Sequence, residues 1–276
     1  MRYPTGFATQ IVDITPQLAG EMLERNTSNR PLNENRAKTY ARDMRSGSWQ
    51  LNGESLKFSR NGLLLDGQHR LRAIQMAERT VPMLVVFGLN DAAQATMDMG
   101  AKRSVSDILR MRGVKNYTKA SDIAQGDMRW QKFGPLAAFQ SGGRLVLTAT
   151  ETVDWYEAHA VEIDLAASPS KRLYDATNHV VSQTAAGILW LQFHRLDVDD
   201  ADAFFERLIK GVASDEHDPI LVLRNRLMRL AADRDAIRRL PQYKAALIVK
   251  AWNLYRTGGT CETLQWSPSG KFPKPV

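Results

Sequence analysis

The stretch that decides the fold runs from Ser55 to Leu89 and reads SLKFSRNGLLLDGQHRLRAIQMAERTVPMLVVFGL. Its first part, SLKFS (55–59), has the alternation of a strand, and Asn61-Gly62 is a tight-turn signal that leads into a second short strand, LLLD (63–66). The next part, residues 68–78, repeats its apolar residues at helical spacing, and VPMLVVFGL (81–89) is a buried strand. The order hairpin, helix, strand predicts a compact α+β unit.

The segment before this unit adds a strand and two helices to it. The segment after it has a different pattern, which is mainly helical. Residues 10–26 predict a strand followed by a short helix, and residues 32–49 predict a helix that Asn33 caps and Gly47 ends. From Tyr117 onward the pattern is helical, broken by Ser168-Pro169, Asp218-Pro219 and Leu240-Pro241. The expected helices cover residues 150–164, 179–195, 200–213, 219–239 and 241–257.

We therefore expect an α+β fold in two parts: a small domain over residues 1–115 and a mainly helical domain over residues 116–276. The tail TLQWSPSGKFPKPV (263–276) is rich in proline and glycine, which predicts an extended segment.

Composition narrows the class of protein. The chain has 276 residues, with 43% apolar and 24% charged side chains, which is ordinary for a globular protein. Cys261 is the single cysteine, so no disulfide framework and no multi-cysteine zinc site can form within one chain. There is no apolar run of about 18 residues and no signal-peptide pattern. We expect a soluble, cytoplasmic protein with no membrane partner.

Positive charge is concentrated in the first part of the chain. Residues 1–115 hold 17 Lys and Arg against 11 Asp and Glu, a net charge of +6, whereas residues 116–276 hold 20 against 19, a net charge of +1. A basic half is typical of proteins with an anionic partner, such as a nucleotide, a nucleic acid or a phosphorylated metabolite. The alternative is that this net positive charge is spread over the surface and only makes the protein more soluble.

The sharpest motif is LDGQHRLRA (65–73). A strand ends at Asp66, the chain turns through Gly67, and a helix opens with a histidine and two arginines near its start. Glycine lets a backbone pass close to a ligand, a helix N-terminus offers N–H groups and a positive dipole end, and arginine forks match phosphate geometry. The motif therefore predicts a phosphate site made of Gly67, His69, Arg70 and Arg72. The alternative is a capped surface helix in which Asp66 pairs with Arg70 for stability.

These residues resemble the ParB/sulfiredoxin-like superfamily, and in particular its branch marked by a DGQHR motif, which includes proteins of phages and mobile elements. The resemblance covers residues 10–112 and is strongest over Asn52–Arg72. It implies that Asp66–Arg72 binds nucleotide phosphates, with a divalent metal ion. The Asp-Gly-x-His-Arg order is most similar to the free-serine kinases of this fold, which implies ATP chemistry.

Two departures separate the chain from other branches of that superfamily. Gln68 stands where sulfiredoxins carry their catalytic cysteine, so sulfiredoxin activity is not expected. The second ParB box is missing, and no helix-turn-helix pattern follows residue 112, so a chromosome-partition clamp is not expected either.

Glu54, in the sequence Asn52-Gly53-Glu54, is the second candidate. By resemblance to the kinase members, it would help to activate the accepting hydroxyl, as a general base or as a ligand of Mg²⁺. Asp66 would hold Mg²⁺ or the acceptor. Otherwise Glu54 is a solvated carboxylate in a turn, or forms a salt bridge with a nearby arginine.

Two further groups of residues are candidate phosphate ligands. Lys102, Arg103 and Ser104 follow the predicted strand at 81–89 and precede a helix start at Val105; the alternative is an ordinary capped turn. Arg224 and Arg229 lie in a predicted arginine-rich helix, which is either a nucleic-acid contact surface or a solvated amphipathic helix.

Together these features favour an enzyme that uses ATP or another NTP with Mg²⁺ for phosphoryl or nucleotidyl transfer in a DNA-related setting. The acceptor would be a hydroxyl on modified DNA or on a small metabolite. The first alternative is a non-catalytic DNA-binding protein that a nucleotide switches. The second, a metal-dependent nuclease, lacks a recognised motif in the sequence.

Overall fold

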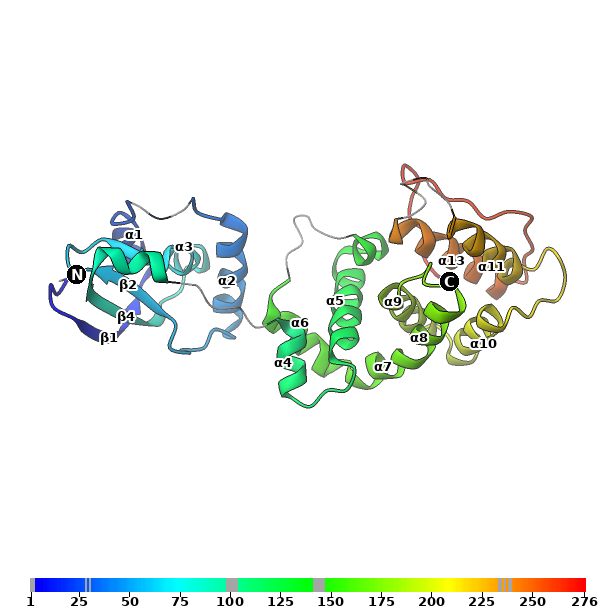
Figure 1. Ribbon diagram of the computed structural model, residues 1–276, viewed down its shortest axis with the longest axis horizontal. Coiled ribbons are helices and arrows are strands. Elements are labelled where there is room, and N and C mark those ends of the chain that lie inside the picture. Colours follow the sequence, from blue (N-terminus) through cyan, green and yellow to red (C-terminus); the bar gives the residue numbers. More distant parts are fainter. Residues whose placement is uncertain are drawn as a thin grey trace. The chain divides into compact units, whose positions relative to one another are not determined.

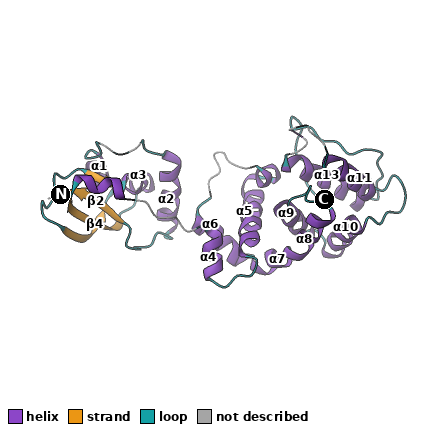
Figure 2. Cartoon of the chain, in the orientation of Figure 1, coloured by secondary structure: helices purple, strands orange, loops and turns teal. Residues whose placement is uncertain are grey.

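The computed structural model describes residues 3–27, 29, 31–97, 104–140, 147–232, 235, 237 and 240–276. The chain divides into two compact units, one of residues 1–102 with 146–150 and one of residues 103–145 with 151–276 (Figure 1). In the described part of the chain, the strands all belong to the first unit, and the second is built from helices (Figure 2). The predicted α+β fold, with strands in the N-terminal part and helices after it, is confirmed.

The division between the units falls earlier than the predicted residue 115. Helix α4 (Val105–Met111) belongs to the second unit because its buried Leu109 packs into the core of that unit, with Val105 and Ile108 against the same core. Helix α4, which lies before the predicted boundary, is therefore part of the helical unit.

A four-stranded mixed sheet is the frame of the first unit. The strands are β1 (Ala8–Ile14), β2 (Ser55–Ser59), β3 (Leu64–Asp66) and β4 (Val81–Leu89), in the order β1-β4-β2-β3. β1 pairs antiparallel with β4, β4 pairs parallel with β2, and β2 and β3 form the antiparallel hairpin that the sequence predicted. The hairpin therefore occupies one edge of the sheet.

Three helices complete the first unit: α1 (Pro16–Leu23), α2 (Glu34–Ser46) and α3 (Gln68–Ala77), followed after β4 by the 3₁₀ turn η1 (Asp91–Thr96). α3 packs against both α1 and α2 and buries Leu71, Ile74 and Ala77, as its helical spacing predicted. The caps of α2 also follow the sequence, since Asn33 Oδ1 accepts a hydrogen bond from the backbone N–H of Arg36 and Gly47 ends the helix with a left-handed backbone.

The second unit is organised around one fully enclosed helix, α9 (Gln183–His194). Every residue from Ala185 to Phe193 is buried, which fits a helix that is apolar on nearly all sides. Among the helices packed against it are α5, α8, α10 and α13. The elements of this unit after α4 are α5 (Tyr117–Phe133), η2 (Pro135–Phe139), α6 (Ala149–Ala158), α7 (Ala160–Leu165), α8 (Ala167–Ala176), α9, α10 (Val198–Lys210), α11 (Pro219–Leu230) and α13 (Pro241–Arg256).

The tail after α13 is extended, as predicted, and packs onto the helices. Leu264 and Phe272 are buried in the helical core, and Phe272 stacks on Phe139 with ring centroids 5.8 Å apart. Trp252 Nε1 donates to the backbone carbonyl of Val276 at 2.9 Å. Within the described ranges, each helix is too short or too polar to cross a bilayer.

A buried polar network ties the helices of the second unit together. Asp127 of α5 is 0% exposed and accepts hydrogen bonds from Arg195 NH1 at 2.6 Å and NH2 at 2.9 Å. It also accepts from Trp155 Nε1 at 2.8 Å and Gln192 Nε2 at 2.7 Å. Arg195 in turn donates to Glu162 at 2.7 Å. A buried charge is tolerated when it is paired and fully hydrogen-bonded in this way.

Replacing Asp127 should therefore destabilise the helical unit strongly. Asp127→Ala removes the shared acceptor of Arg195, Trp155 and Gln192 from the core, and we expect its free energy of unfolding to fall by about 3–5 kcal/mol. Urea unfolding followed by tryptophan fluorescence measures this loss. Glu162→Gln is the control, because the Glu162 side chain is 27% exposed and a glutamine oxygen can still accept from Arg195, so it should cost about 1 kcal/mol. Equal losses in the two variants would contradict the central role of Asp127.

Candidate functional site

The turn between β3 and α3 is shaped by a close approach of backbone to side chain. Gly67 lies between Asp66, the last residue of β3, and Gln68, the first of α3, and its φ is +109°. A Cβ at this position would lie 2.5 Å from Leu56 Cδ2 and 3.3 Å from Leu56 Cα on the neighbouring strand. Packing against Leu56 thus accounts for the glycine, in addition to the ligand approach that the sequence suggested.

Four charged side chains, Glu54, Lys57, Asp66 and Arg70, meet beside this turn, and we call them the ionic cluster. Asp66 Oδ2 accepts hydrogen bonds from Lys57 Nζ at 2.7 Å and from Arg70 NH2 at 3.0 Å. Arg70 NH1 donates to Glu54 Oε2 at 3.2 Å. The Arg70 side chain is only 10% exposed, whereas that of Glu54 is 62% exposed. The cluster holds two positive and two negative charges.

Asp66 is held in its ionised form. Burial alone would raise its pKa, but the hydrogen bond from Lys57 and the charges of Arg70 and Lys57 outweigh burial, so the pKa of Asp66 lies below its usual value. At neutral pH the carboxylate therefore anchors both cations.

The other predicted phosphate ligands of α3 point elsewhere. Gln68 Oε1 accepts from Asn26 Nδ2 at 2.9 Å, and His69 Nε2 accepts from the backbone N–H of Asn33 at 3.0 Å. Arg72 Nε donates to Glu34 at 3.3 Å. His69 and Arg72 share a helix face, as predicted, but that face meets the start of α2. Of the predicted set, the structure brings together Glu54, Asp66, Gly67 and Arg70.

The start of α3 has no cap from a side chain of its own. Its N-cap is Gly67, which provides no side-chain cap, and its first turn contains no acidic residue. The positive end of the helix dipole is therefore balanced only from outside the helix, by residues such as Asp66 that precede it.

Lys57 is a member of the cluster that the sequence argument missed. It stands directly opposite Asp66 in the register of the β2–β3 hairpin. Oppositely charged residues across an antiparallel pair stabilise each other, so the predicted hairpin already contained the signal for this pair.

The two carboxylates of the cluster differ in how readily they would coordinate Mg²⁺. One oxygen of Asp66 already accepts from two cations, whereas Glu54 is exposed and linked to Arg70 alone among the residues the structure describes. Glu54 is therefore the better ligand. In those same ranges, no group of three or more His, Cys, Asp and Glu side chains could hold a metal ion by itself, so Mg²⁺ here would need phosphate oxygens as additional ligands.

Lys102 and Arg103, predicted as phosphate ligands, lie outside the described residues. Ser104 caps α4: its Oγ accepts from the backbone N–H of Asp107 at 3.2 Å, and Asp107 Oδ2 accepts from the backbone N–H of Ser104 at 2.8 Å. This reciprocal capping box is the ordinary structural role of a serine before a helix.

The two arginines predicted to contact nucleic acid have different environments. Arg224 NH1 donates to the backbone carbonyls of Leu208 and Ile209 at the end of α10, so it serves as a helix C-cap. Arg229 is exposed, and its side chain makes no hydrogen bond or ion pair with the described part of the chain.

Comparison of the chain with protein-family models, with curated proteins and with solved structures gave no match. The resemblance to the ParB/sulfiredoxin-like superfamily therefore rests on the motif residues themselves.

Gly67→Ala should destabilise the first unit. The positive φ and the contact with Leu56 together predict a loss of about 2–4 kcal/mol in the free energy of unfolding. Gly53→Ala is a matched control, because Gly53 also has a positive φ of +84° but open space around it, and it should lose about 1 kcal/mol. Urea unfolding followed by circular dichroism compares the two; equal losses would remove the Leu56 contact from the explanation.

Asp66 should make stability depend on pH in the acid range. Because its folded pKa lies below its usual value of 3.8, its contribution is fully present above that value and is lost as pH falls through the folded pKa. The difference in unfolding free energy between wild type and Asp66→Asn should be constant from about pH 5 to 8 and shrink below about pH 4. A difference that does not change with pH would argue against the ion pairs.

Proposed function

We propose that the ionic cluster and the start of α3 bind a nucleoside triphosphate and transfer its terminal phosphoryl group to a hydroxyl. The observation that carries the proposal is the position of Arg70, in the first turn of a helix without a side-chain cap, between the partly buried carboxylate of Asp66 and the exposed one of Glu54. The DGQHR resemblance adds ATP as the expected nucleotide and Mg²⁺ as the expected ion.

Phosphate binding requires an exchange of partners at Arg70. The bond from Arg70 to Glu54 is the longest in the cluster, at 3.2 Å, and its acceptor is the exposed one. Asp66 is held by Lys57 at 2.7 Å and keeps the second arm of the guanidinium in place. An incoming phosphate therefore displaces Glu54 and takes its place on Arg70, where charge-assisted bonds to phosphate are strong.

The displaced Glu54 then becomes available for chemistry. It accepts the proton of the acceptor hydroxyl as that oxygen attacks the terminal phosphorus, and the nucleoside diphosphate leaves. Mg²⁺ would neutralise charge on the phosphates and would be held mainly by phosphate oxygens and water, which leaves Glu54 free to act as the base. Arg70 and the N–H groups at the start of α3 hold the transferred group.

The acceptor and the setting follow from the resemblance. The DGQHR branch favours a DNA-related role in the cytoplasm, with a hydroxyl on modified DNA or on a small metabolite as acceptor. The principal alternative, a nucleotide-switched DNA-binding protein, uses the same phosphate site without turnover.

Nucleotide binding and turnover separate these possibilities. We expect ATP, or one of CTP, GTP and ADP, to raise the melting temperature in the presence of Mg²⁺, by the equivalent of about 2.7 kcal/mol at 100 times Kd. Glu54→Gln should keep this shift and lower nucleotide turnover by about 10²–10⁴-fold, because the base is lost and the phosphate ligands remain. Turnover is measured as release of the diphosphate.

Glu34→Gln is the matched control, since Glu34 is also an exposed glutamate paired with an arginine of α3, at 3.3 Å, but outside the cluster. It should keep both binding and turnover. Nucleotide binding without turnover in the wild type would favour the DNA-binding alternative. No shift with any nucleotide would refute the phosphate site.

A further inference from the structure

Strand β1 forms one edge of the four-stranded sheet, and its outer side faces no other strand. Its ladder partner is β4, which lies on its inner side. Beyond that ladder, no residue of Ala8–Ile14 makes a hydrogen bond with another described residue. Because ladder bonds alternate between the two sides of a strand, about three or four of its residues direct their N–H and C=O groups away from the sheet. The edge is therefore able to pair with a further strand.

The opposite edge of the same sheet is protected. β3 has only three residues. The backbone N–H of Leu64 donates to the carbonyl of Arg25 at 2.9 Å, and the carbonyl of Leu64 accepts from Asn29 Nδ2 at 2.7 Å. Proteins usually guard an exposed edge with a covering segment, a lysine or a proline. The segment after α1 covers β3, whereas the sequence of β1, ATQIVDI, contains no lysine, arginine or proline.

The side chains of β1 leave apolar surface open at this edge. Four of its seven residues are exposed: Thr9, Gln10, Ile11 and Asp13. Ile11, at the centre of the strand, is 63% exposed, and Phe7, just before the strand, is 72% exposed. Ile11 lies opposite Leu84 of β4, so these two side chains share one face of the sheet. A long edge strand with an exposed apolar residue at its centre is typical of a strand that pairs with another chain.

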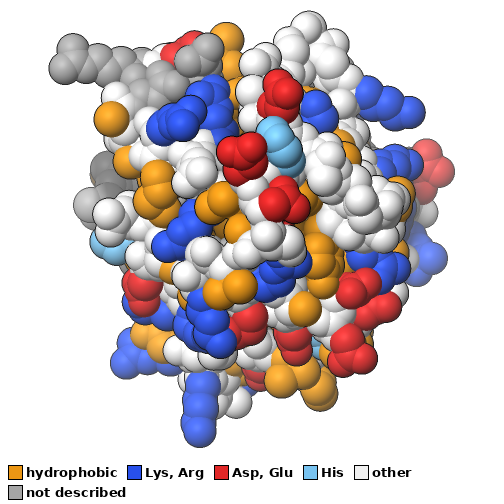
Figure 3. All heavy atoms as spheres, turned by 90° about the vertical axis from the view of Figure 1, so that its right-hand side faces the viewer, with side chains coloured by type: hydrophobic (Ala, Val, Ile, Leu, Met, Phe, Trp, Pro, Cys, Tyr) orange, Lys and Arg blue, Asp and Glu red, His pale blue; other side chains and the backbone are white. Residues whose placement is uncertain are grey.

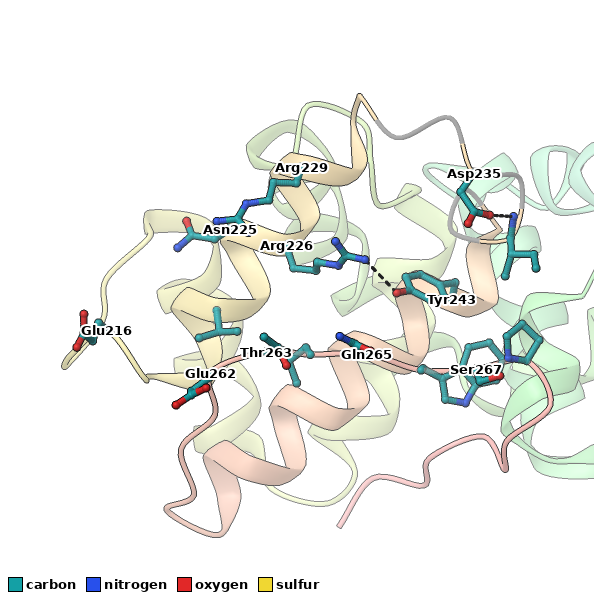
Figure 4. Close-up of a pocket in the computed structure, with 15 residues that line it drawn as sticks. Glu216, Asn225, Arg226, Arg229, Asp235, Tyr243, Glu262, Thr263, Gln265 and Ser267 are labelled. Carbon is teal, nitrogen blue, oxygen red and sulfur yellow. Dashed lines mark hydrogen bonds between the residues drawn. The ribbon is translucent and has the colours of Figure 1, made fainter.

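The charged surfaces of the helical unit indicate a partner less directly. On the side of the molecule in Figure 3, Lys and Arg side chains are interspersed with Asp and Glu, which is typical of a solvated surface. In the pocket beside α11, Arg226 points to Tyr243 and Arg229 points to Asn225 (Figure 4), so the two arginines do not converge on one ligand. The open edge of β1 is therefore the stronger indication of an interaction.

A second copy of the chain fits this edge. We propose that two copies of the protein pair through β1, antiparallel and related by a two-fold axis at Ile11, so that their two sheets join into one. Ile11 is the middle residue of Ala8–Ile14, so an axis at this position gives each of the seven residues a partner. Antiparallel pairing over this length supplies about six to eight backbone hydrogen bonds.

The side chains of β1 are complementary to their own copy in this register. Asp13 is the only charged residue of the strand, and it meets Thr9, whose hydroxyl can donate to the carboxylate. The two Ile11 side chains meet at the axis, in the row of the sheet that already contains Leu84. An axis at Asp13 would instead oppose two carboxylates and leave most of the strand unpaired. The charge pattern therefore favours a copy of this strand, with the axis at its centre.

This pairing does not rest on the proposed function. In the strand order β1-β4-β2-β3, the ionic cluster lies beside β2 and β3, and β3 is the edge farthest from β1. In the paired sheet the two clusters therefore lie at the two outer ends, away from the joined strands. Loss of pairing and loss of nucleotide binding can consequently be measured separately.

Sedimentation equilibrium of the full chain tests the pairing. We expect a species of twice the chain mass of 31.0 kDa. Ile11→Lys and Ile11→Glu each place two like charges across the axis, and each should raise the dissociation constant of the dimer by about tenfold or more. An equal mixture of the two variants should restore the dimer, because a lysine then faces a glutamate across the axis. Ile11 is exposed, so both variants are expected to fold, and circular dichroism checks this.

Val161→Lys is the matched control, because Val161 is a 78% exposed apolar residue of the helical unit. It should leave the dimer intact, as should Glu54→Gln in the ionic cluster. A wild type that stays monomeric up to about 100 µM overturns the proposal. A dimer that survives Ile11→Lys, that is lost equally in Val161→Lys, or that the mixture of lysine and glutamate variants does not restore overturns it as well.

Discussion

The close approach of Gly67 to Leu56 is the constraint on which the first unit depends. It fixes the point at which β3 turns into α3, because a side chain at residue 67 would meet strand β2 at 2.5 Å. With that point fixed, Asp66 stands at the end of β3 opposite Lys57, and Arg70 lies in the first turn of α3. Packing of uncharged groups thus decides which charged groups meet.

The charges that meet there are balanced, and this sets the conditions for any ligand. Arg70 is almost fully buried, and a buried cation without a partner would be costly, so the resting protein needs the carboxylates beside it. The two carboxylates are not equivalent. Asp66 is partly buried and bonded to two cations, whereas Glu54 faces solvent, where an ion pair contributes about 0–1 kcal/mol. In the proposed function, a phosphate would therefore replace Glu54 and leave Asp66 in place.

The sequence predicted those elements whose signals are local. The alternation of 55–59, the Asn61-Gly62 turn and the spacing of 68–78 were enough for the hairpin and helix, because neighbouring residues determine them. Distant packing was not predictable: Leu109 draws α4 into the second unit, and the expected helix 150–164 divides into α6 and α7. Ser168-Pro169 lies within the first turn of α8, where proline is tolerated because its missing N–H would have no helical partner.

The sequence shows where arginines occur in a helix, but it does not show which neighbouring element each side chain meets, as α11 illustrates. Arg224 and Arg229 are five residues apart, which at about 100° per residue places them about 140° apart around the helix. Arg224 consequently meets the carbonyls that end α10, while Arg229 is exposed. The same reasoning separates Arg70 from Arg72 in α3, since one meets Asp66 and the other Glu34. Whether an arginine can bind an anion therefore depends on which distant element its face meets, and a count of basic residues along the chain does not contain that information.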